Sequence, residues 1–124
     1  MSNAAEAFKK LVEVVAHLRD PVTGCPWDKE QTHQSLKPYV IEETYEVIDA
    51  IDQGPKELCK ELGDLLLQVM LHSQIAKDNK TFEIKDVIEG ITEKMITRHP
   101  HVFGDKKLET TDQVLKNWEQ IKQK

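Results

Sequence analysis

Two predicted helices meet at the tripeptide Gln53-Gly54-Pro55, and this junction constrains the fold more than any other feature of the chain. Apolar residues recur at helical spacing over residues 36–53 and again over residues 55–79. Glycine commonly follows the end of a helix, and proline suits the first turn of the next one. The sequence therefore predicts two helices that fold back on each other as an antiparallel hairpin.

Acidic residues occupy matching positions on the two sides of this junction. Glu43 and Glu46 precede it, and Glu61 and Asp64 follow it. The i,i+3 spacing within each pair places its two side chains on one helix face, and the near-symmetric placement brings both pairs to the same height. Carboxylates about 4 Å apart repel by about 4 kcal/mol per pair at an effective dielectric of about 20. Such a cluster requires cations, and oxygen-only ligands favour Mg²⁺, with Mn²⁺ as the alternative.

The competing interpretation is an acidic stripe that is simply solvated. Aspartate and glutamate make up 22 of the 124 residues, so acidic spacings of this kind arise readily by chance. The neighbouring residues argue for a partly buried cluster instead, because the four carboxylates are interleaved with apolar side chains: Ile41, Val47, Leu62 and Leu65.

Every other periodic segment also has helical period. We expect further helices over residues 5–19 and 83–97 and from Thr110 onward, with loops over residues 20–26 and 98–104. Thr110 and Gln113 have the spacing of a capping box. The predicted fold is all-α, a four-helix bundle with a C-terminal helix. At 124 residues the chain is expected to form a single domain, residues 1–124, with a core over about residues 5–122.

The segment Leu65–Leu71 is apolar almost all the way round its predicted helix. A helix that is apolar on every face is buried on every face. In so short a chain a second copy of the protein is the simplest cover, which predicts a homodimer. A bundle formed within one chain is the alternative.

Composition argues against several classes of partner. A formal net charge of −5 is unlike the basic face of a nucleic-acid-binding protein. No apolar run approaches the length of a membrane span, and no signal-peptide pattern is present. Cys25 and Cys59 have no partner at metal-binding or redox spacing, which is typical of reduced thiols in a cytoplasmic protein.

Basic and aromatic residues near the C-terminus are weaker candidates for a ligand site. Lys94 and Arg98 are spaced i,i+4 and could hold phosphate oxygens, or they could be a surface pair favoured by the helix dipole. Trp118 fits a core or interface anchor better than a platform for a base. His99 and His101 flank Pro100, and a structural role in that loop is favoured over metal binding.

Several segments together resemble the MazG family of nucleoside triphosphate pyrophosphohydrolases, over about residues 8–122. They are Leu-Arg-Asp-Pro at 18–21, Gly-Cys-Pro-Trp-Asp at 24–28, Glu-Glu-Thr-Tyr-Glu at 42–46, Glu-Leu-Gly-Asp at 61–64, Arg-His-Pro-His-Val-Phe at 98–103 and Asn-Trp-Glu-Gln-Ile-Lys at 117–122. The resemblance implies an all-α, usually dimeric protein, a homodimer or a dimer of dimers. It also implies Mg²⁺-dependent cleavage of a nucleoside triphosphate between its α and β phosphates, which yields the monophosphate and pyrophosphate.

Carried over by position, the resemblance also implies roles for individual residues. Glu42 would be the catalytic base for the attacking water or a ligand of another ion. The other roles are metal ligation by Glu43, Glu46, Glu61 and Asp64, and substrate binding by Lys94, Arg98 and Trp118. Many family members carry two such domains in tandem, whereas this sequence carries one.

Two further kinds of function stay open at this point. Within the same chemistry, the substrate could be one pyrimidine nucleotide such as dUTP or dCTP, or phosphoribosyl-ATP. A different class of function is a non-catalytic helical module that binds metal. The di-iron bundles of that class use Glu-x-x-His pairs, and neither acidic group of this chain contains one. No segment of the sequence encodes a recognisable pocket for one base.

Overall fold

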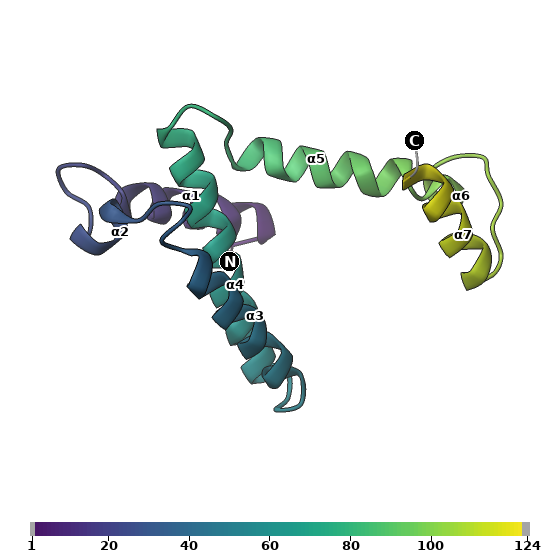
Figure 1. Ribbon diagram of the computed structural model, residues 1–124, viewed down its shortest axis with the longest axis horizontal. Coiled ribbons are helices and arrows are strands. Elements are labelled where there is room, and N and C mark those ends of the chain that lie inside the picture. The colour runs from purple at the N-terminus through teal and green to yellow at the C-terminus, as the bar shows by residue number, and fades with distance from the viewer. Residues whose placement is uncertain (1, 123–124) are drawn as a thin grey trace. The chain divides into compact units, whose positions relative to one another are not determined.

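The computed structural model describes residues 2–122, and every regular element in that range is a helix (Figure 1). The helices in chain order are α1 (Ala4–Leu18), α2 (Pro26–Glu30), α3 (Lys37–Ile51), α4 (Pro55–Asp78), α5 (Ile84–Thr97), α6 (Pro100–Phe103) and α7 (Thr111–Lys122). The prediction of an all-α fold is confirmed. The short helices α2 and α6 were not predicted; each has a proline in its first turn and ends after little more than one turn.

The turn between α3 and α4 has the local geometry that its sequence favours. Gly54 has a φ of 110°, a conformation that residues with a Cβ rarely adopt, and Pro55 begins α4 directly after it. The two helices pack along each other as a hairpin (Figure 1). This confirms the predicted hairpin at Gln53-Gly54-Pro55.

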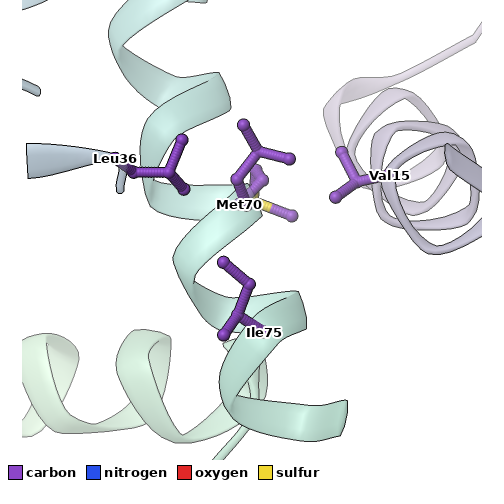
Figure 2. Packing of buried hydrophobic residues seen from close by; sticks show 5 residues of the cluster. Val15, Leu36, Met70 and Ile75 are labelled. Atoms are coloured by element: carbon purple, nitrogen blue, oxygen red, sulfur yellow. The ribbon is translucent and has the colours of Figure 1, made fainter. Parts of the chain in front are cut away.

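The chain divides into two compact units, one up to Ile84 and one from Lys85 onward. In the first unit, α1 packs against α4, and α4 packs against α3. The buried cluster of this unit joins α1, the segment before α3, and the second half of α4 (Figure 2). Its members are Val15, Leu36, Met70, Leu71 and Ile75.

The half of the hairpin nearest the turn is much less covered than this core. The buried residues of α4 all lie between Gln68 and Ala76, and Ala50 is the one buried residue of α3. Apolar side chains on both helices are exposed, and we call them the hairpin face: Ile41, Tyr45, Ile48, Leu62, Leu66 and Val69. The expectation that Leu65–Leu71 is covered on every side is therefore not met within one chain: α1 and α3 cover part of α4, so Met70 and Leu71 are buried, whereas Leu66 and Val69 are exposed.

The second unit contains α5, α6 and α7. The predicted capping box at the start of α7 is confirmed: the backbone N–H of Gln113 donates to Thr110 Oγ1, and the backbone N–H of Thr110 donates to Gln113 Oε1. The Lys106 ammonium donates to Oδ1 of Asn117, the buried residue of α7. Within residues 2–122, no helix combines the length and the apolar composition that crossing a membrane requires.

Candidate functional site

The hairpin brings carboxylates from α3 and α4 together. Glu43 of α3 and Glu61 and Asp64 of α4 each offer one carboxylate oxygen, and these oxygens all lie within 4.8 Å of one another. The three residues occupy the same height because the helices run antiparallel from a tight turn, as their spacing predicts. We call this group the carboxylate cluster.

The cluster is electrostatically strained without a cation. Partial burial raises the pKa of Glu43, and the nearby charges of Asp64, Glu46 and Glu42 raise it further. Partial burial also raises the pKa of Glu61, followed by the hydrogen bond and the charge repulsion that Asp64 contributes. The charged form of each group is thus disfavoured in the folded protein. A bound cation would reverse this effect by supplying the missing positive charge.

The chemistry of the donor atoms fits a hard divalent cation. All three groups are carboxylates, and neither histidine nor thiolate belongs to the cluster among residues 2–122. Oxygen ligands suit Mg²⁺, Ca²⁺ or Mn²⁺, and Mg²⁺ usually binds through a few carboxylates together with the phosphates of a substrate.

Glu46 and Glu42 lie beside the cluster, on α3. The charge of Glu46 raises the pKa of both Glu43 and Glu61, so its carboxylate is near both groups. Glu42 acts in the same direction on Glu43. Both side chains are exposed, and neither oxygen joins the group of three in the side-chain conformations of this structure.

The surroundings of the cluster are more open than the sequence suggested. Glu43 and Glu61 are half-buried, but Asp64 is exposed, Ile41 is 60% exposed and Leu62 is 48% exposed. Ile41 and Leu62 therefore form part of the hairpin face, whereas Val47 and Leu65 are half-buried. Convergence from two helices is the feature that separates this cluster from a solvated stripe on a single helix.

Lys94 and Arg98 belong to the second unit, one helical turn apart at the end of α5. The backbone N–H of Arg98 donates to the carbonyl of Lys94, at 3.0 Å. Both residues line an open pocket of about 340 Å³ that also includes Glu93 of α5 and Ile121 of α7. The pocket therefore presents two cationic side chains and one carboxylate.

Trp118 of α7 packs against the residues that follow α5. The guanidinium carbon of Arg98 lies 5.6 Å from the centre of the Trp118 ring, which is the geometry of a cation–π contact. The rings of His99 and Trp118 lie 6.3 Å apart, and those of His99 and His101 lie 5.5 Å apart. The sequence singled out each of these residues, but it contained no signal that they pack together.

His99 precedes α6 and His101 lies within it, where the sequence predicted a loop. Nδ1 of His99 is 2.6 Å from the carbonyl oxygen of Met95, which places the proton of that imidazole on Nδ1. Nδ1 of His101 and Nε1 of Trp118 are buried and have no hydrogen-bond partner within residues 2–122. Neither histidine belongs to a group of three or more potential metal ligands in that part of the chain.

Arg19 holds the loop between α1 and α2 in place. Its Nε donates to Asp78 at 3.0 Å, and its Nη1 donates to the carbonyl oxygens of Asp28 and Gln31. These contacts tie three segments of the first unit together. They explain Arg19 as a structural residue, with most of its donors already used.

Comparisons with known proteins agree with this arrangement. Residues 31–103 match the MazG nucleotide pyrophosphohydrolase domain. The chain is 55% identical over 116 residues to the uncharacterized protein YabN of Bacillus subtilis, covering 93% of this chain and 24% of that protein. It is 51% identical over 123 residues to the nucleoside triphosphate pyrophosphohydrolase/pyrophosphatase MazG of Thermotoga maritima, covering 98% of this chain and 46% of that protein. The chain thus spans less than half the length of either relative.

A solved structure has the same fold. The crystal structure of a mazG-related protein from Thermotoga maritima superposes with a TM-score of 0.75 at 25% sequence identity. The superposition covers 94% of this chain and 99% of the other. The match therefore extends well beyond the segment that carries the carboxylates.

Proposed function

The chain belongs to the MazG nucleotide pyrophosphohydrolase domain family, and we propose that it hydrolyses nucleoside triphosphates to the monophosphate and pyrophosphate. The observation that carries the proposal is the convergence of Glu43, Glu61 and Asp64 from two helices. The raised pKa values of Glu43 and Glu61 are what a site built around a divalent cation requires before the cation binds.

The four carboxylates Glu43, Glu46, Glu61 and Asp64 would hold Mg²⁺. Glu46 would join the other three by a change of side-chain conformation, since its charge already acts on two of them. Bound Mg²⁺ supplies positive charge that neutralises these carboxylates and the oxygens of the triphosphate. Mn²⁺ is the alternative ion, because it takes the same oxygen ligands.

The chain's own residues would carry out the proton transfer and position the substrate. Glu42 takes a proton from a water molecule, whose oxygen then bonds to the α-phosphorus. The bond from that phosphorus to the oxygen bridging the α and β phosphates breaks, and pyrophosphate leaves with the bonding electron pair. Lys94 and Arg98 would hold phosphate oxygens by charge and hydrogen bonds, and Trp118 would orient Arg98 through their cation–π contact.

We propose that residues 1–124 form a single catalytic domain with a core over about residues 5–122, because the family resemblance extends over most of the chain. We also propose a homodimer, because a second copy would cover the hairpin face, where Tyr45 is 65% exposed. A dimer of dimers would use further apolar surface on α5, where Ile91 is also exposed. Two free thiols, Cys25 and Cys59, fit a reducing cytoplasm.

Light scattering tests the dimer. Ile48→Lys places a charge in the middle of the hairpin face, and the measured mass should fall to that of one chain. Val22→Lys is the matched control, because Val22 is 87% exposed outside that face. A wild-type chain that is monomeric at high concentration would refute the dimer proposal.

Pyrophosphate release tests the activity. The purified chain is incubated with Mg²⁺ and a panel of ribonucleoside and deoxyribonucleoside triphosphates, dUTP, dCTP and phosphoribosyl-ATP included. Release from several substrates supports a broad hydrolase, and release from one alone assigns a narrow specificity. Glu61→Gln should abolish release, while Glu13→Gln, which changes an exposed carboxylate of α1, should not. A folded wild-type chain that releases pyrophosphate from none of them would leave the non-catalytic metal-binding module as the better hypothesis.

A further inference from the structure

Two histidines that are far apart in the sequence meet in the first unit, away from the carboxylate cluster. His33 lies in the segment between α2 and α3, and His72 lies in the second half of α4. Their Nδ1 atoms are 2.8 Å apart, and their ring planes are parallel to within 2°. The ring centres are 5.0 Å apart, so both nitrogens lie in the space between the two rings.

This contact fixes the protonation of the pair. A separation of 2.8 Å between two ring nitrogens is a hydrogen bond, which needs one Nδ1 to donate and the other to accept. Neutral rings meet this requirement only as different tautomers. A pair carrying one extra proton meets it as well, because an imidazolium donates to its neutral partner. A pair with both rings protonated cannot, since two donors with like charge would face each other.

We propose that His33 and His72 form a pH-sensitive latch, which holds the segment before α3 against α4 and opens when the second ring takes up a proton. Other contacts also hold the segment in this unit: Leu36 is fully buried in the core, and the carbonyl oxygen of Gln31 accepts a hydrogen bond from Nη1 of Arg19. A local box of hydrogen bonds between Thr32 and Ser35 makes the segment a compact turn, so release of His33 would loosen residues 32–35 together while both ends of the segment stay held.

Several charged groups lie around His33, and the neighbouring charge that lowers the pKa of His72 is that of His33. Arg19, Lys29 and Glu30 line the same open pocket as His33, and Asp78 forms an ion pair with Arg19. Lys37 begins α3 four residues after His33. The pocket has a volume of about 380 Å³, which is large enough for water to deliver the proton.

The direction of the effect on stability follows from His72. Partial burial lowers the pKa of His72 below its usual 6.5, and the charge of His33 lowers it further. Below about pH 6.5 the unfolded chain thus binds more protons than the latched one, so the free energy of unfolding falls as the pH falls. Each protonation step measured in a titration describes the pair as a whole and not one histidine, because the two rings share a hydrogen bond.

Nuclear magnetic resonance of the ¹⁵N-labelled chain tests the shared proton directly. Near pH 8 we expect one protonated and one unprotonated Nδ1 in the pair, with a ¹⁵N–¹⁵N coupling across the hydrogen bond. Acidification should remove the coupling at the second protonation step. Two rings that show no coupling and titrate independently of each other would overturn the proposal.

Thermal unfolding supplies a second measurement that needs no activity. Between about pH 8 and about pH 5 the wild-type Tm should fall more than that of His72→Gln, because glutamine keeps a hydrogen-bonding partner that does not titrate. His33→Gln is the reciprocal variant if His72→Gln does not fold. His17→Gln, which removes an exposed histidine of α1, should keep the wild-type slope. Equal slopes in the wild type and in both latch variants would also reject the latch.

Discussion

Glu43 on α3 and Asp64 on α4 place carboxylate oxygens within 4.8 Å of each other, although 20 residues separate them in the sequence. Asp64 is the neighbouring charge that contributes most to the raised pKa of Glu43. The two residues therefore destabilise each other in the absence of a cation and become complementary once a cation lies between them. Both consequences can be measured in the folded chain.

Magnesium should stabilise the protein by binding the folded state. Adding millimolar MgCl₂ is expected to raise Tm, because a ligand that binds only the native chain adds to its free energy of unfolding. Asp64→Asn should reduce that rise, while Glu13→Gln should leave it unchanged. Calorimetry or a fluorescence melt measures both. An equal rise in Asp64→Asn and in the wild type would place the ion elsewhere.

The stability of the metal-free chain should depend on pH through the same carboxylates. The pKa of Glu43 and that of Glu61 are raised above 4.5, so the folded chain binds more protons than the unfolded chain just above that pH. The free energy of unfolding therefore falls as these groups ionise with rising pH. Urea unfolding in EDTA should show a smaller fall for Glu43→Gln than for the wild type. Addition of Mg²⁺ should oppose the fall in the wild type, because a bound cation favours the ionised form of these carboxylates.

Glu42→Gln separates a proton acceptor from a metal ligand. If Glu42 accepts the proton of the attacking water, kcat should fall by about 10²–10⁴-fold, the range typical of general bases. The magnesium concentration that gives half-maximal activity should change little. Steady-state kinetics over a range of MgCl₂ concentrations measures both quantities. A large loss of magnesium affinity with kcat preserved would make Glu42 a ligand instead.

The contact between Arg98 and Trp118 predicts that the two residues act together on the substrate. Arg98→Lys should raise KM by about tenfold or more, because lysine loses the planar fork that holds phosphate oxygens. Trp118→Leu should raise KM in the same direction by removing the ring beneath the guanidinium. The double variant should lose less than the sum of the two single losses. Additive losses would show that Trp118 does not act through Arg98.

The local parts of this structure were predictable from the sequence because they depend on short-range chemistry. Helical periodicity predicted the bounds of α1, α3, α4 and α5 to within two residues, and the Thr110–Gln113 box predicted the start of α7. The exposure of the hairpin face was not predictable in this way. The sequence pattern shows which face of a helix is apolar, whereas the exposure of that face depends on which other helices pack against it.

The sequence by itself determined the hairpin and the meeting of Glu43, Glu61 and Asp64, since a glycine–proline turn and i,i+3 spacing suffice for both. Only the tertiary structure decided that Glu46 stands beside the group of three, that Arg98 lies over Trp118, and that His33 meets His72. Arg98 and Trp118 are 20 positions apart in the sequence, and His33 and His72 are 39 positions apart. The position of the Glu46 carboxylate depends on the rotation of its side chain. No spacing rule covers them, because the packing of whole helices sets the distances.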